Sequence, residues 1–126
     1  MSNDVSIELI RAIVENLRRA DDEWESLAMV IELSDGRVSG TYGYTYGPAD
    51  RVGATSARPS TIEQEATAYL NGYFKVGEPW PVKLLVQFDR TKREYEIVFE
   101  DTDASRWNVT PSNLDEIRQE LRPKFG

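Results

Sequence analysis

Carboxylate side chains are the residues of this chain that could most readily do chemistry. Asp101 and Asp103 lie close together, directly after Glu100. Paired acids can hold a divalent cation or share acid–base work. A calcium-binding loop also needs a glycine and a distal glutamate, and this segment has neither at the required spacing. The pattern therefore favours an exposed turn over a metal or catalytic site.

The rest of the chain lacks the side chains on which most catalytic sites depend. It contains no histidine and no cysteine, which excludes Ser-His and Cys-His nucleophiles, thiolate metal sites and disulfides. Its glycines follow no phosphate-binding fingerprint, because no Gly-Lys-Ser/Thr motif is present. We therefore expect no catalytic, cofactor-binding or metal-ligating residue, and a binding protein rather than an enzyme.

The net charge of -7 and the pI near 4.6 indicate which partners the chain would attract. An acidic surface repels nucleic acid and anionic lipid and attracts basic proteins. The same charge could simply keep the protein soluble, and both interpretations stay open. No segment is apolar enough to span a membrane, and Met1 to Asp4 show no signal-peptide pattern, so we expect a cytoplasmic protein without a membrane partner.

The hydrophobic pattern of the first half predicts one helix, a β-hairpin and a long loop. Apolar residues at helical spacing predict a helix over residues 5–19. Strict alternation predicts strands over 24–33 and 38–46, joined by the Asp35-Gly36 turn that hairpins prefer. Residues 47–60 are rich in small residues and proline, which is typical of a loop.

The second half predicts a helix, a second hairpin and a last helix. The middle helix begins at Ser60 or Thr61, and strands follow over 82–88 and 94–100. The last helix begins at Thr110 with Pro111 in its first turn. We therefore predict a single α+β domain over residues 1–126. Its elements follow the order α-β-β-α-β-β-α, and helices pack on a four-stranded antiparallel sheet.

Aromatic residues are the remaining candidates for contact with a partner. Tyr42, Tyr44 and Tyr46 alternate along one strand and share a face. We expect the first two to pack beneath a helix. Tyr46 is nearest the loop, and it is the better contact residue because tyrosine buries area and keeps a polar tip. The three tryptophans stand at element boundaries, where packing at the rim of a core is the commoner role.

Two tryptophan segments and the chain end carry a resemblance to a known family. They are residues 78–81 (Glu-Pro-Trp-Pro) with the apolar run after them, residues 101–113 around Trp107, and residues 120–125 (Glu-Leu-Arg-Pro-Lys-Phe). Together they resemble the YezG-like immunity proteins of bacterial polymorphic toxin and contact-dependent inhibition systems. The resemblance covers about residues 10–125. It implies a protein that neutralises the C-terminal domain of a cognate toxin by direct contact. Contact residues vary widely among immunity proteins, so the resemblance assigns none.

We therefore expect an immunity protein that binds a basic toxin of the nuclease type, as a monomer or weak homodimer. The alternative is a small acidic secretion chaperone that binds a segment of an effector and forms a stable dimer. Acids and aromatics near an exposed edge would make the contact in the first case. The candidates are Asp21, Asp22, Glu23, Tyr46, Glu94 and Glu96.

Overall fold

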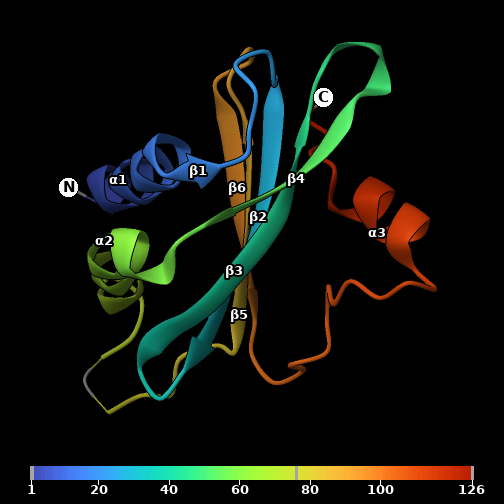
Figure 1. The fold of residues 1–126 in the computed structure, drawn as a ribbon. Helices are drawn as coiled ribbons and strands as arrows, with labels where there is room; N and C mark the ends of the chain where they lie inside the picture. The colour runs from blue at the N-terminus through green and yellow to red at the C-terminus, as the bar shows by residue number, and fades with distance from the viewer. Residues whose placement is uncertain (1, 76, 126) are drawn as a thin grey trace.

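An antiparallel sheet of six strands runs through the centre of the molecule, and helices cover both of its faces (Figure 1). The computed structural model describes residues 2–75 and 77–125. The elements are α1 (Ser2–Glu15), β1 (Leu17–Arg18), β2 (Ser26–Ser34), β3 (Arg37–Tyr46), the 3-10 turn η1 (Pro48–Asp50), β4 (Val52–Ala57), α2 (Pro59–Asn71), β5 (Lys83–Asp89), β6 (Glu94–Glu100) and α3 (Leu114–Leu121). The strands stand in the order β1-β4-β3-β2-β5-β6. The α+β class and the antiparallel sheet are confirmed.

The two predicted hairpins form the middle and one side of this sheet. Strand β2 lies between β3 and β5, and β6 lies beyond β5. The β2–β3 turn has positive φ at both Asp35 (54°) and Gly36 (73°), as a tight hairpin turn requires. The Asp-Gly signal in the sequence is therefore confirmed.

Two further strands lie outside the four that the sequence predicts. Residues 47–60 contain η1 and β4, and β4 pairs with β3 from Gly43↔Thr55 to Tyr46↔Val52. Helix α1 ends at Glu15, and the next residues form β1 against the end of β4. The predicted four-stranded sheet and its element order are wrong in these details. The sequence of β4, Val-Gly-Ala-Thr-Ser-Ala, lacks the large apolar residues that mark a strand.

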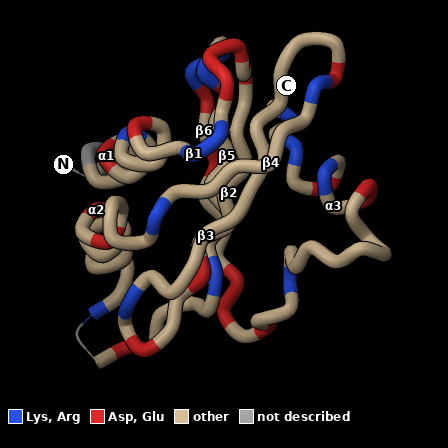
Figure 2. Tube along the Cα trace, viewed as in Figure 1, with Lys and Arg blue, Asp and Glu red and all other residues tan. Residues whose placement is uncertain are grey.

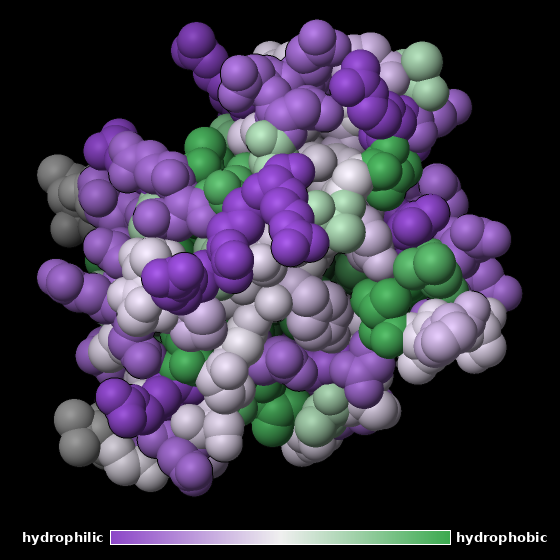
Figure 3. All heavy atoms as spheres, in the orientation of Figure 1, coloured by the Kyte–Doolittle hydropathy of each residue, from purple (hydrophilic) through white to green (hydrophobic). Residues whose placement is uncertain are grey.

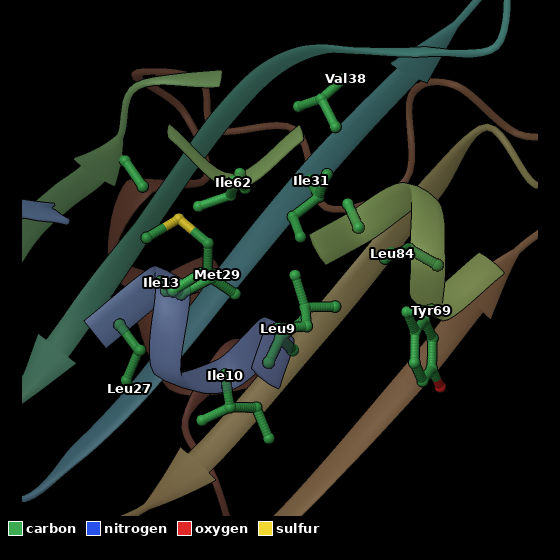
Figure 4. Close-up of a cluster of buried hydrophobic side chains, with 14 of the residues drawn as sticks. Leu9, Ile10, Ile13, Leu27, Met29, Ile31, Val38, Ile62, Tyr69 and Leu84 are labelled. Carbon is green, nitrogen blue, oxygen red and sulfur yellow. The ribbon is translucent and has the colours of Figure 1, made fainter. Parts of the chain in front are cut away.

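One face of the sheet carries the larger core. The alternating row Leu27, Met29, Ile31 and Leu33 of β2 points toward α1 and α2, as its period predicts. Side chains from both helices meet this row between the layers (Figure 4). The helical members are Leu9, Ile10, Ala12, Ile13, Ile62, Ala66, Tyr69 and Leu70.

The opposite face is covered by α3 and the segment that leads to it (Figure 1). Ala28 and Val30 of β2 pack here with Tyr44 and Tyr46 of β3. Trp107, Ile117 and Leu121 cover them from the other layer. Both faces of β2 are therefore buried, which explains its continuous apolar sequence. The expected packing role of Tyr44 and Trp107 is confirmed.

A buried lysine holds the segment before α3 against the sheet. Lys83 is only 1% exposed, and its Nζ donates to the Arg106 carbonyl at 2.8 Å, Asn108 Oδ1 at 2.6 Å and the Tyr42 hydroxyl at 3.1 Å. Tyr42 in turn donates to the Trp107 carbonyl at 3.0 Å. Burial lowers the pKa of Lys83, and the Glu32 carboxylate 3.8 Å away opposes that shift. Three consecutive residues, 106–108, are thus fixed by two side chains of the sheet.

The acids after β6 close a turn, as their sequence predicts. Asp103 Oδ1 accepts from the Ser105 amide and hydroxyl, and Glu100 accepts from the Thr102 and Asp103 amides. The Glu100 carboxylate also accepts from Arg106 at 2.8 Å. This carboxylate is only 14% exposed and does not face water, contrary to its position in the strand pattern.

We expect Lys83→Met to loosen the α3 side of the molecule. The variant keeps most of the side-chain volume but removes the donors of three hydrogen bonds. The free energy of unfolding should fall by about 1–3 kcal/mol, the usual cost of unsatisfied polar partners, and hydrogen exchange over residues 106–108 should accelerate. Urea denaturation and exchange mass spectrometry measure the two effects. Lys124→Met removes an exposed ammonium as a control, and equal losses in both variants would contradict this role.

Glu100 should give the fold an acid-sensitive contribution. Hydrogen bonding to Arg106 and to two backbone amides lowers the pKa of Glu100 from 4.5 to about 2. A lowered folded-state pKa means that the stabilisation is complete above pH 4.5 and is lost as pH falls through about 2. The difference in unfolding free energy between the wild type and Glu100→Gln should shrink over that window. Denaturant titrations across the window test this, and a constant difference would be the contrary result.

Candidate functional site

Most of the sequence-predicted contact residues gather at one end of the sheet. Ser26 at the start of β2 pairs with Asp89, and Asp89 pairs with Glu94 across the β5–β6 hairpin. The turn that holds residues 21–23 therefore lies beside this hairpin. Figure 2 shows acidic and basic residues crowded at that end. The sequence prediction that these acids contact a partner stays a prediction, and residues 21–23 lie beside the start of the central strand β2.

Asp21 and Glu23 are engaged with a basic side chain of the same chain. Arg51 donates to both carboxylates at 3.2 Å, in exposed ion pairs. The Asp22 carbonyl accepts from Arg90 at 2.7 Å, and the Arg90 guanidinium stacks 3.8 Å from the Trp24 ring centroid. This turn therefore ties the start of β4 to the end of β5. Its acids remain exposed, but their charge is partly balanced.

Tyr46 does not belong to the surface, and the prediction that it contacts a partner is wrong. It is 1% exposed, and its hydroxyl donates to the Arg118 carbonyl at 2.6 Å. Burial raises the pKa of the Tyr46 phenol. Helix α3 covers the face that Tyr46 shares with Tyr44, which the strand pattern alone could not show.

Glu94 and Glu96 are exposed, and no ion pair among the described residues uses them. Glu96 lies opposite Gln87, whose amide donates to the Leu121 carbonyl at 2.8 Å. Opposite residues of a pair share a face, so both glutamates lie on the α3 side of β6. Their charges are available to a partner.

An apolar groove lies on the other side of β6, against α1. It has a volume of about 420 Å³, and its walls are Ile7, Ile10 and Val14 of α1 with Phe88 and Tyr95 of the sheet. Arg11, Glu15 and Arg93 stand at its margin. The Tyr95 hydroxyl is 2.8 Å from Ser6 Oγ, which holds the ring near the helix. Ile7 and Tyr95 are among the most exposed large apolar residues, at 44% and 39%.

The sequence contains a signal for this groove. Ile7, Ile10 and Val14 follow the spacing i, i+3, i+7, beside the buried row of Leu9 and Ile13. Helix α1 therefore has a wider apolar sector than one layer of core needs. Alternation places Tyr95 on the inward face of β6, but α1 does not cover it fully, and the residue is 39% exposed.

Strand β6 is also a free edge of the sheet. Its only neighbour among the described strands is β5. In an edge strand every second residue directs its N–H and C=O groups away from the sheet, where they can pair with another chain. We call the groove, this edge and the two glutamates Glu94 and Glu96 the α1–β6 surface. It combines apolar area and unpaired backbone groups with two acids on the α3 side of β6, while Arg11, Glu15 and Arg93 stand at the margin of the groove.

No protein-family model, no curated protein and no solved structure matches this chain. None of the helices in residues 2–75 and 77–125 has the length and hydropathy to cross a bilayer. What the α1–β6 surface can do follows from its own chemistry. A solvent-open apolar groove with charged residues at its margin, next to a free strand edge, has features that protein interfaces share.

The acids of the turn, Asp21 and Glu23, should contribute to stability, whereas the acids of β6, Glu94 and Glu96, should not. Asp21→Asn/Glu23→Gln removes both partners of Arg51, and we expect a loss of up to about 1 kcal/mol, the usual range for exposed ion pairs. Glu94→Gln/Glu96→Gln should leave the unfolding free energy unchanged, because those acids have no ion pair to lose. Urea denaturation at low and high salt measures both variants. A larger loss of unfolding free energy in Glu94→Gln/Glu96→Gln than in Asp21→Asn/Glu23→Gln would contradict this expectation.

Proposed function

We propose that this protein is an inhibitor of the immunity-protein type, which binds a basic toxin domain directly through the α1–β6 surface. The single observation that carries the proposal is the arrangement around β6. The free edge of β6 separates an apolar groove of about 420 Å³ on the α1 side from two glutamates on the α3 side, which have no ion pair within the described residues.

The groove supplies the part of the interface that excludes water. Exposed apolar side chains rimmed by polar ones are typical of interaction sites. Ile7 and Tyr95 could bury much of their remaining area against a partner, and Tyr95 is of the type that often dominates binding energy.

The charge supports a basic partner. Glu94 and Glu96 are part of the net charge of -7. That charge would steer a positively charged domain toward the protein. Nuclease toxins must bind phosphate and are commonly basic, so their binding clefts are complementary to such a surface. The resemblance to YezG-like immunity proteins points to the same class of partner and stays a prediction.

Site-specific crosslinking tests the surface and the partner together. We would place the photocrosslinker p-benzoylphenylalanine at Tyr95, which is 39% exposed, and, as a control, at the exposed Gln119 of α3. Irradiation in the native cell should attach the C-terminal domain of a toxin to position 95 and not to position 119. Attachment of an unfolded effector segment to a stable dimer would support the secretion chaperone instead.

Charge reversal should weaken the complex with that toxin domain. We expect Glu94→Lys/Glu96→Lys to reduce the affinity for the toxin domain at least about tenfold, because the variant loses close charge pairs with basic residues of that domain. Most of the salt dependence of the affinity should be lost with them. Glu116→Lys/Glu120→Lys makes the same charge change at exposed positions of α3 and should bind normally. Calorimetry at two salt concentrations and rescue of growth from the toxin are the readouts. Equal loss in both variants would contradict the assignment of the surface.

A further inference from the structure

The opposite edge of the sheet is only partly closed. Strand β1 pairs with Ala57 and Ser56 of β4 and then stops. Arg19 has a φ of 62°, a left-handed conformation that turns the chain away from the strand direction. Thr55 Oγ1 donates to the Arg18 carbonyl at 2.7 Å and closes the end of β1. No strand within residues 2–75 and 77–125 lies on the outer side of residues 52–55.

The backbone groups that face outward along this stretch can be assigned. The Gly47 amide donates to the Arg51 carbonyl at 2.8 Å, which makes these residues a hydrogen-bonded pair of the β3–β4 ladder. Such pairs recur at every second residue of an antiparallel ladder. Gly53 and Thr55 therefore bond to β3, and Val52 and Ala54 present N–H and C=O groups to the outside. Ser56, the next in the series, uses its outward groups to pair with Arg18.

Two cavities meet at this open stretch, and Ala54 and Thr55 border both. The first, of about 410 Å³, lies on the α3 side between Tyr42 and Tyr44 and the segment of residues 108–110. The second, of about 310 Å³, lies beside Arg18 and Arg19, in line with β1. Figure 3 shows a hollow between the sheet and the α3 side, with apolar residues at its rim.

The walls of the two cavities differ in chemistry. Tyrosine rings and Val109, which is 39% exposed, make the first cavity largely apolar. The guanidinium groups of Arg18 and Arg19 take part in none of the ion pairs within the described part of the chain. The second cavity is therefore complementary to a carboxylate. Arg18 pairs with Ser56, two residues from Ala54, so its side chain starts on the face of the first cavity. Side chains two residues apart in an extended strand share a face, so one strand could place an acidic and an apolar side chain, two residues apart, in the two spaces.

We propose that residues 52–55 bind an extended segment of another protein as an added strand, in line with β1 and antiparallel to β4. An acidic side chain of that segment pairs with Arg18 and Arg19, and an apolar residue two positions along, on the same face, enters the cavity under residues 108–110. Main-chain bonds to Val52 and Ala54 give the affinity, as in other cases of strand addition. The site is on the edge opposite the α1–β6 surface and does not depend on the function proposed for that surface.

Two synthetic peptides test the proposal. The probe is fluorescein-labelled Ser-Thr-Glu-Thr-Val-Thr-Ser, with glutamate and valine two residues apart, and its matched control carries lysine in place of glutamate. We expect fluorescence anisotropy to show binding of the glutamate peptide, weakened by salt, and at least about tenfold weaker binding of the lysine peptide. Absence of binding by the glutamate peptide up to millimolar concentration, or equal binding of both peptides, would overturn the proposal.

Variants and amide exchange locate the bound peptide. Arg18→Ser/Arg19→Asn should weaken binding about tenfold, and asparagine tolerates the left-handed turn at position 19. Lys124→Ser/Arg93→Asn removes the same charge near the other edge and should bind normally. In the wild-type protein, saturation with peptide should slow hydrogen exchange of the Val52 and Ala54 amides, measured by NMR. Protection on β6 instead of these amides would refute the site even if the peptide binds.

Discussion

The buried ammonium of Lys83 is the interaction on which the arrangement of this molecule depends. Removing a charge from water is costly, and it is tolerated here because three oxygen acceptors surround the Nζ atom. Two of those acceptors belong to residues 106 and 108. Holding them against the sheet brings Trp107 and α3 over Tyr44 and Tyr46. Without that cover the second face of the sheet would be an exposed apolar surface.

Burial of both faces leaves the edges of the sheet as the places where backbone groups can meet a partner. Free edges promote aggregation, and proteins protect them with charge or short strands. Both devices occur here. Strand β6 carries Glu94 and Glu96, which would repel the same edge of a second copy, whereas β4 is partly covered by the two-residue strand β1. A charge that disfavours self-association also selects a basic partner, so protection and recognition need not conflict.

Sequence reasoning succeeds here where a segment has a strong period or a specific turn. The buried row of β2, the Asp35-Gly36 turn and the bounds of β6 are of this kind. It fails at β4, whose small residues make a strand only because β3 offers a partner ladder. It also fails at the start of α3. The Asn113 side chain accepts from the Thr110 amide, and the helix begins at Leu114 rather than at Pro111. Such local bonds compete with helix formation at polar residues.

The candidate surface was harder to predict because exposure is a tertiary property. A period of two correctly places Tyr42, Tyr44 and Tyr46 on one face, but it cannot say that a distant lysine draws a helix over that face. The same limit explains Tyr95. Its face is the inward one, yet α1 covers the strand incompletely and leaves a groove. The exposure of Glu94 and Glu96 could be predicted from the sequence. A charged side chain without a buried partner stays in contact with water, whatever position its strand takes in the sheet. Glu100, on the same face of β6, shows the limit of this rule, because Arg106 and two backbone amides reach its carboxylate and leave it 14% exposed.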